Sequence, residues 1–243
     1  MISVDQPACF DSQLVVRFSS RDDGPMLARN LTLHADHIVA NRRQFCLASG
    51  TSYENVVYQV IEYGETESYN NLVDVTELDT VKYKPGVKAD GLFTMQPQVG
   101  LFLPVADCIA TVVYDPMGPS LAVLHLGRHS TLSNLIELTL QRFLRAGASL
   151  KDLVVWMSPS AQRASYQLEW FTAKDDSSWQ GFYDMKDGRY YVDLQGYNKA
   201  MFMRNGVRED NIHISQVDTM KNEHYFSHAT GDRDRSALLA VLQ

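Results

Sequence analysis

No stretch of this sequence approaches the roughly 18 consecutive apolar residues that a membrane-spanning helix needs, so a transmembrane protein is not expected. The first residues, MISVDQPACFDSQ, lack a basic region followed by an apolar core, so export is not expected either. Cysteine is scarce. Cys9, Cys46 and Cys108 are far apart and odd in number, which disfavours a disulfide framework and favours a reducing compartment. We therefore expect a cytoplasmic protein with no membrane partner.

Positive charge is also in short supply. Lys and Arg total 22 against 29 Asp and Glu, which gives a formal net charge of -7, and no Lys/Arg block stands out. Because phosphate contacts need a basic face, no nucleic-acid partner is expected, and small-molecule or protein partners are favoured. The 45% hydrophobic content is enough for a real core. With no repeat, low-complexity segment or convincing linker, we predict a single domain over residues 1–243.

The best chemical pair lies in the stretch from Lys88 to Thr131. Cys108 stands between two strand-like runs, and His125 ends a third run after an Asp115-Pro116 turn signal. A nearby imidazole is the commonest way to favour the thiolate that nucleophilic or metal-binding chemistry needs. From the spacing alone, the commoner arrangement is a small buried cysteine and a hydrogen-bonded core histidine.

Many predicted strands and few predicted helices favour the α+β class. β-branched and apolar runs bounded by turn residues predict the strands, and apolar residues at helical spacing predict the helices. The predicted strands are Leu14–Phe18, Asn55–Ile61, Leu72–Val75, Thr80–Tyr83, Val99–Val105, Ile109–Tyr114, Leu121–Leu124, Leu153–Met157 and Asn211–Gln216. A first helix is predicted after an N-cap at Asp36 and runs to about Ala48, a second is capped by Ser130 or Thr131 and ends near Gly147, and a third is capped by Asp193 and ends before Gly206. A hairpin turn is predicted at Asp187-Gly188.

Three motifs around this pair resemble the YfiH family, also called the laccase-domain or multicopper polyphenol oxidoreductase family. Its members read A-D-(A/G)-x-x-(T/S), A-D-C-x-P and H-A-G-W-R-G. Here these become ADGLFT at 89–94, ADCIA at 106–110 and HLGRHS at 125–130, in the same order and spacing. Weaker matches extend over nearly the whole chain, among them Tyr166-Gln167-Leu168 for the family's Y-E-V and Asp234-Arg235-Ser236 near its G-R-M.

The resemblance implies a fold and an activity. The fold would be YfiH-like, with mixed β-sheets packed together and flanking helices, layered α/β/β/α. Family members are similar to zinc-dependent purine nucleoside enzymes, with phosphorolysis of adenosine, inosine and methylthioadenosine, and adenosine deamination. The laccase label implies copper. One thiol and one imidazole cannot supply a multicopper cluster, so copper is not expected.

The family's metal site is incomplete in this sequence. The resemblance implies three ligands, and two of them match Cys108 and His125. The third is the histidine of a Q-V-H-G motif, which reads Gln59-Val60-Ile61-Glu62 here. Isoleucine cannot coordinate a metal, and a catalytic zinc normally has three protein ligands. The replacement candidates are Glu62, His129 and His34, and the sequence does not choose between them.

Anion-binding residues are expected on both sides of this pair. Arg21 matches the family's S-T-R-x-G-G and Arg42 its N-R, and a guanidinium suits phosphate or ribose oxygens. For Arg42, a surface position and an internal polar anchor are equally open. The amides from Gly127 onward, at a predicted helix start, would offer a further anion site, with Arg128 beside them. The family has Trp-Arg where this chain has Arg128-His129, which indicates a shifted or lost contact.

Three functions stay open at this point. The first is a divergent family enzyme that acts on purine nucleosides by phosphorolysis, deamination or both, at a zinc held by Cys108 and His125, with phosphate as a partner. The second is a metal-free hydrolase or deamidase with Cys108 as nucleophile and His125 as base, in the manner of the cytotoxic necrotising factor toxins and chemotaxis receptor deamidases, whose fold is similar. The third is a catalytically inactive paralogue.

Overall fold

Two six-stranded sheets form the body of the protein. The computed structural model describes residues 6–64 and 66–243. The first sheet has the order β1 (Leu14–Phe18), β15 (Asp234–Leu242), β7 (Gly100–Val105), β3 (Val56–Val60) and β5 (Val87–Lys88), with β2 (Leu27–Ala28) also paired to β15. The second has the order β14 (Ile212–Ile214), β10 (Val154–Met157), β8 (Ile109–Asp115), β9 (Ser120–Leu126), β6 (Gly91–Thr94) and β4 (Leu72–Asp74). Both sheets are mixed, because parallel and antiparallel pairs occur in each.

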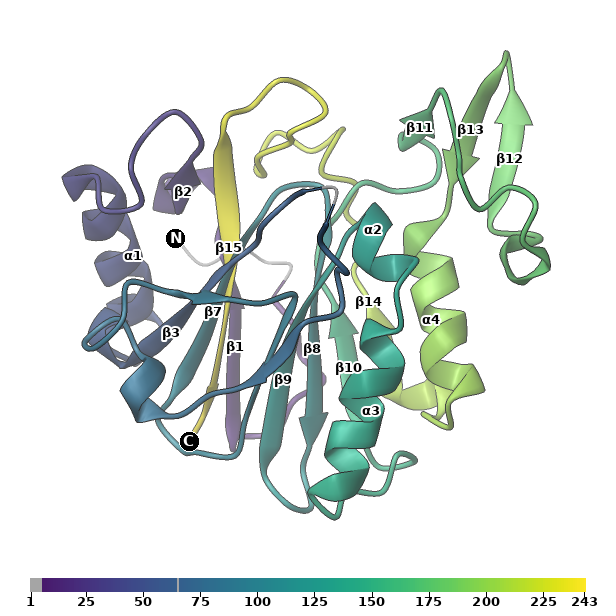
Figure 1. Ribbon diagram of the computed structural model, residues 1–243. Coiled ribbons are helices and arrows are strands. Elements are labelled where there is room, and N and C mark those ends of the chain that lie inside the picture. The colour runs from purple at the N-terminus through teal and green to yellow at the C-terminus, as the bar shows by residue number, and fades with distance from the viewer. Residues whose placement is uncertain (1–5, 65) are drawn as a thin grey trace.

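The two sheets pack face to face, and helices cover their outer faces (Figure 1). The helices are α1 (Asp36–Ala48), α2 (Arg128–Thr131), α3 (Leu135–Arg145) and α4 (Leu194–Arg204). Phe45 and Cys46 of α1 pack against the first sheet, whereas α3 and α4 contribute to the core over the second. The predicted α+β class with layers in the order α/β/β/α is therefore confirmed.

Alternation along β15 shows how one strand serves two layers. Leu238, Ala240 and Leu242 join the core between the sheets. The intervening residues, Ala237, Leu239 and Val241, join the core beneath α1. A strand buried on both faces reads as a continuous apolar run rather than as an apolar and polar alternation. Every residue of β8 and β9 is buried for the same reason.

A smaller third sheet stands apart at one side of the molecule (Figure 1). It has the order β11 (Gln167–Leu168), β13 (Arg189–Val192) and β12 (Tyr183–Lys186). The predicted hairpin turn joins β12 to β13, with φ of 52° at Asp187 and 73° at Gly188. Short 3-10 helices lie at Arg21–Asp23, Tyr53–Asn55, Glu77–Asp79, Ser177–Trp179 and Glu209–Asn211. None of the helices in the described part of the chain is long and apolar enough to cross a membrane.

Some predicted elements were wrong. Thr80–Tyr83 forms turns after a 3-10 helix rather than a strand, because the backbone bends back at Thr80. The helix predicted after His125 is divided into α2 and α3, and Leu132 between them is 39% exposed. The first helix starts at Asp36 rather than after it. Strands β6 and β15 were not predicted, although β15 is the longest described strand.

Candidate functional site

Strand pairing brings Cys108 and His125 together. In the antiparallel register of β8 and β9, Ala110 lies opposite His125 and Ile109 opposite Leu126. Cys108 immediately precedes β8, and Gly127 immediately follows β9. A Cβ atom placed on Gly127 would lie 2.9 Å from Cys108 Sγ and 3.6 Å from His125 Nε2. The thiol and the imidazole therefore border the same small space, which Gly127 leaves open.

Asp107 holds the turn before Cys108 in place. Its φ of 70° is a left-handed conformation that L residues seldom adopt. The carboxylate accepts hydrogen bonds from Thr219 Oγ1 (2.7 Å), Ser227 Oγ (3.1 Å) and the Ala229 amide (2.8 Å). These bonds hold the backbone in that strained conformation, and they connect the cysteine to the segment that precedes β15.

Burial keeps both reactive side chains neutral. It raises the pKa of the Cys108 thiol to about 12, with a further contribution from the charge of Asp107. It lowers the pKa of His125 to about 4. The His125 Nδ1 atom is buried and has no hydrogen-bond partner among the described residues. A thiolate and imidazolium pair, which the metal-free hydrolase would use, is therefore unfavourable at pH 7 in this arrangement.

The donor atoms at this pair are too few for a complete metal centre. No group of three or more His, Cys, Asp or Glu side chains within residues 6–64 and 66–243 is placed to hold a metal ion. Ile61 lines the same cavity as Cys108 and His125 but offers no donor. A zinc ion would thus find two of the usual three protein ligands, so the residues present do not fit the metal site that the family resemblance implies.

The replacement ligands considered from the sequence are engaged or lie elsewhere. Glu62 pairs with Lys88 at 2.6 Å. His34 is exposed and does not line the cavity around Cys108. His129 lines that cavity, and its ring stacks on Tyr69 with 4.6 Å between centroids.

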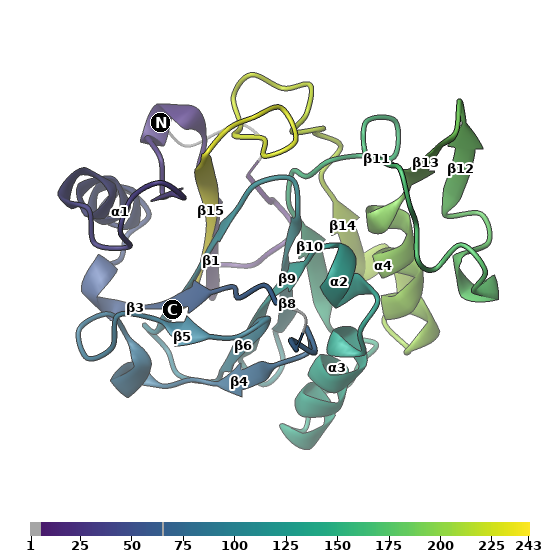
Figure 2. The same cartoon turned by 45° about the horizontal axis from the view of Figure 1, so that its top comes forward.

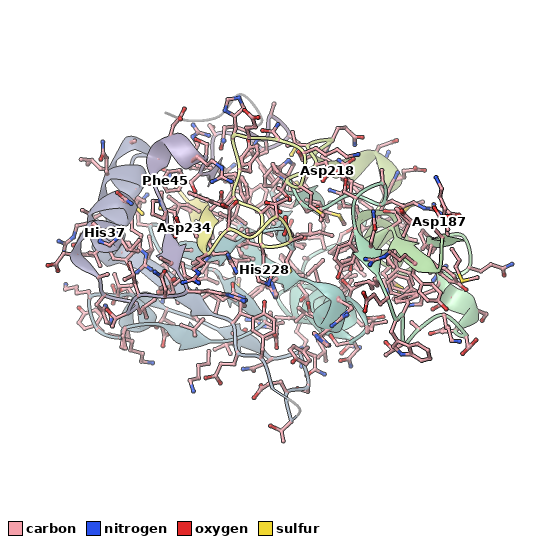
Figure 3. All side chains as sticks on the ribbon, turned by 90° about the horizontal axis from the view of Figure 1, so that it is seen from above. His37, Phe45, Asp187, Asp218, His228 and Asp234 are labelled. Carbon is pink, nitrogen blue, oxygen red and sulfur yellow. The ribbon has the colours of Figure 1, made fainter. Side chains whose placement is uncertain are left out.

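A cavity of about 800 Å³ surrounds the pair. It lies where β3, β7 and β9 end and β15 begins, at the end of the sheets that comes forward in Figure 2. Its wall combines aromatic rings and cationic or imidazole groups, and no carboxylate occurs among the described residues that line it. The aromatic and cationic members are Tyr58, Tyr63, Tyr69, Tyr166, Arg29, Arg128, Arg235, His129 and His228. His228 lies centrally in Figure 3, far from the hairpin tip at Asp187.

Two of the arginines expected to bind anions lie outside this cavity. Arg21 pairs with Asp232 and covers the ring of Phe226 at 4.5 Å. Arg42 belongs to the buried face of α1 and is completely buried. Its guanidinium donates to the carbonyls of Met26 and Leu33 and to two tyrosine hydroxyls. Both side chains are therefore engaged in contacts within the protein, outside the cavity around Cys108.

The remaining expected anion residues lie at the cavity. Arg128 lines it, with Nη2 3.5 Å from His129 Nε2. The Gly127 amide donates to Ser130 Oγ at 2.9 Å, so this amide is already used. The single turn of α2 replaces the long helix whose free amides were expected to hold an anion.

Other residues of the site were not predicted. Arg29, Tyr63, Tyr69 and Tyr166 lie outside the three motifs around Cys108 and His125. Only the fold brings them to the cavity. Arg235 had a signal, because the sequence around it resembles the family's G-R-M. The match to that motif did not point to a role for Arg235, because Arg235 comes close to Cys108 and His125 only through β15, which was not predicted.

Comparison with known proteins identifies the family. The model of the multi-copper polyphenol oxidoreductase laccase family matches residues 15–242, which is nearly the whole chain. The protein therefore belongs to this family, as the sequence motifs predicted.

The curated relatives include proteins named purine nucleoside phosphorylases. One from Synechocystis is 24% identical over 161 residues, which are 57% of this chain and 61% of the relative. One from Bacteroides thetaiotaomicron is 26% identical over 150 residues, covering 57% and 54%. The matches thus span just over half the length of these two relatives. The match to YlmD of Bacillus subtilis is longer, at 24% identity over 86% of this chain and 80% of that protein.

Solved structures have the same fold. YlmD from Geobacillus stearothermophilus aligns with a TM-score of 0.82 at 20% identity, covering 98% of this chain and 94% of that one. YfiH from Bacillus licheniformis aligns with a TM-score of 0.81 at 21% identity, covering 95% and 93%.

Proposed function

We propose that this protein is a purine nucleoside phosphorylase that works in the cavity around Cys108 and His125. In this reaction phosphate attacks C1′ of the ribose. A bond forms between C1′ and a phosphate oxygen, the bond between C1′ and the purine nitrogen breaks, and the base leaves with a proton. The observation that carries the proposal is the composition of the cavity wall, which joins aromatic rings to cations and has no carboxylate in its described part.

The size and the rings of the cavity suit a nucleoside. A volume of about 800 Å³ is within the range of roughly 300–1,000 Å³ for small-molecule sites. Tyr63 and Tyr166 bring aromatic surface to the wall, and a purine stacks favourably on such rings. Tyr63 also packs edge-on against His125, with 6.3 Å between ring centroids. The base would therefore be held close to the imidazole.

His125 and the arginines supply the polar contacts. A neutral imidazole carries one N–H donor and one acceptor nitrogen, and because His125 Nδ1 is buried, a substrate would be contacted through Nε2. Its backbone is fixed on both sides, since its amide donates to Asp90 O at 2.9 Å and its carbonyl accepts from Ser130 Oγ at 2.6 Å. The arginines of the wall attract an anionic co-substrate to a chain whose net charge is -7.

Product analysis tests this function. Inosine and adenosine are incubated with the protein, with and without inorganic phosphate, and free base and ribose 1-phosphate are measured. We expect base release that requires phosphate and is abolished in His125→Ala. Conversion of adenosine to inosine would assign deamination to the same cavity. If neither nucleoside is turned over, with or without added zinc, the proposal is wrong.

A further inference from the structure

Arg235 has an unused hydrogen-bonding group inside the cavity. The side chain lies at the start of β15 and is only 5% exposed. Its Nη1 donates to the carbonyls of Asp234 (2.7 Å) and Asp232 (3.2 Å). Its Nη2 is buried and has no hydrogen-bond partner among the described residues. A buried donor without a partner costs free energy, so a charged group left in this state indicates that something else completes it.

Sheet pairing places Arg29 next to Arg235. Leu27 of β2 lies opposite Arg235 of β15, and Ala28 lies opposite Asp234. Arg29 follows β2 directly and lines the same cavity. No side-chain hydrogen bond or ion pair joins its guanidinium to another described residue, and its one ring contact is with Tyr63 at 5.8 Å. The positive charge of Arg29 acts together with burial to lower the pKa of Arg235.

No described carboxylate forms an ion pair or a side-chain hydrogen bond with either of these two guanidinium groups. Asp107, whose charge reaches Arg235, uses its oxygens on Thr219, Ser227 and Ala229. Asp232 gives its carboxylate to Arg21. Two like charges are thus held together, one of them buried, without a counter-charge in the described wall. Such an arrangement favours a bound anion with several oxygen acceptors.

We propose that Arg235 and Arg29 form a subsite for a phosphate-sized oxyanion. This subsite deepens the proposed function, because it assigns the phosphate to the β2 and β15 side of the cavity rather than to Arg128 or the start of α2. The same chemistry fits inorganic phosphate and the phosphoryl group of a sugar phosphate or nucleotide. Arg235 Nη2 would donate from the buried side, and Arg29 would approach from the exposed side.

Binding measurements test the subsite without any turnover. Inorganic phosphate, ribose 1-phosphate and adenosine monophosphate are titrated by calorimetry into wild-type protein and into Arg29→Gln, Arg235→Gln and Arg43→Gln. Arg43 is the matched control, because it is exposed on α1, outside the cavity, and its loss removes the same charge. We expect phosphate affinity to fall roughly tenfold or more in Arg29→Gln and Arg235→Gln, and to stay within twofold in Arg43→Gln.

Arg29→Gln keeps the test decisive if Arg235→Gln fails to fold, since the exposed Arg29 side chain forms no hydrogen bond with residues 6–64 or 66–243. Tightest binding of inorganic phosphate would identify the free ion as the ligand, whereas tighter binding of either organic phosphate would identify a phosphoryl group. Unchanged phosphate affinity in Arg29→Gln, or no binding of any of the three by wild type, would overturn the subsite. If phosphate binding depends on Arg29 and Arg235 but the protein cleaves no nucleoside, the subsite is supported and the proposed phosphorylase activity is refuted. If phosphorolysis occurs and is unchanged in Arg29→Gln, the phosphorylase activity is supported and the subsite is refuted.

Discussion

Alanine at Gly127 is the sharpest perturbation of the site, because its effect comes from a single methyl group. The backbone of Gly127 has φ of -99° and ψ of -173°, which any residue adopts, so the substitution adds no backbone strain. The new Cβ would lie 2.9 Å from Cys108 Sγ and 3.3 Å from His125 Cε1. Both separations are shorter than van der Waals contact of about 3.5–4.0 Å. Either the thiol and the ring move, or the ends of β8 and β9 separate.

The cost should be that of overpacking in a rigid interior, roughly 1–3 kcal/mol of unfolding free energy. Urea unfolding, followed by circular dichroism, measures it. Gly118→Ala is the control, since its nearest neighbour would be Asp115 Oδ2 at an ordinary 3.5 Å. We expect the control to change stability by less than about 0.5 kcal/mol. Phosphorolysis should fall in Gly127→Ala but not in Gly118→Ala.

A double-mutant cycle identifies the atom responsible. Cys108→Ala removes the sulfur, so Gly127→Ala should cost less in that background than in wild type, with a coupling on the order of 1 kcal/mol. Equal costs in the two backgrounds would show that the thiol does not contact this position. A Gly127→Ala protein as stable as wild type would refute the close meeting of Cys108 and His125 on which the candidate site rests.

Three further predictions concern charge and metal. Burial lowers the pKa of His125 from 6.5 to about 4. The contribution of neutral His125 to the unfolding free energy is therefore complete above pH 6.5, and on the order of 3 kcal/mol of it is lost as the pH falls through 4. Urea unfolding from pH 7 to 4 should show a shallower decline in His125→Phe than in wild type, and equal slopes would contradict the burial argument. Ile61→His should raise zinc affinity more than roughly tenfold in a chelator competition, and Ile61→Leu is the control. Unchanged zinc affinity in Ile61→His would mean that position 61 does not face Cys108. Arg42→Met should lower the unfolding free energy by roughly 2–5 kcal/mol, because it strips partners from two carbonyls and from the hydroxyls of Tyr53 and Tyr58; wild-type stability would show that these groups find other partners.

Local patterns in the sequence predicted the α+β class and the strand ends beside Cys108 and His125, whereas the layered sheets and the pairing of the two side chains were implied by the family resemblance. Strand runs flanking Cys108 and His125 placed both side chains at strand ends, and antiparallel pairing of β8 and β9 then brings them to one point. Asp193 was expected to cap a helix, and its side chain accepts a hydrogen bond from the Gly196 amide at the start of α4. In each case the deciding contacts lie within a few residues or within one hairpin.

The cavity wall was not predictable in the same way, because its residues meet only through distant pairings. Arg29 and Arg235 come together through β2 and β15, and neither of these strands was predicted. Arg42 was left open between an anion contact, a surface residue and an internal polar anchor, and the fold encloses it completely among carbonyls and hydroxyls. Only the three-dimensional arrangement separates an anchoring arginine from a binding one.

The position of β15 also determines how the oxyanion subsite can move. This strand pairs with β7 from Ser236 onward and with β1 from Leu238 onward, so Arg235 directly precedes its doubly paired part, and nearly all its residues are buried. The amides of the doubly paired part should therefore exchange with solvent only when the whole protein unfolds, whereas Arg29, after a two-residue strand, should be released by local opening. Arg235 is thus a fixed half of the subsite and Arg29 a hinged half. The fixed guanidinium of Arg235 would select anions by shape. The guanidinium of Arg29 would control how long a bound anion stays in the subsite.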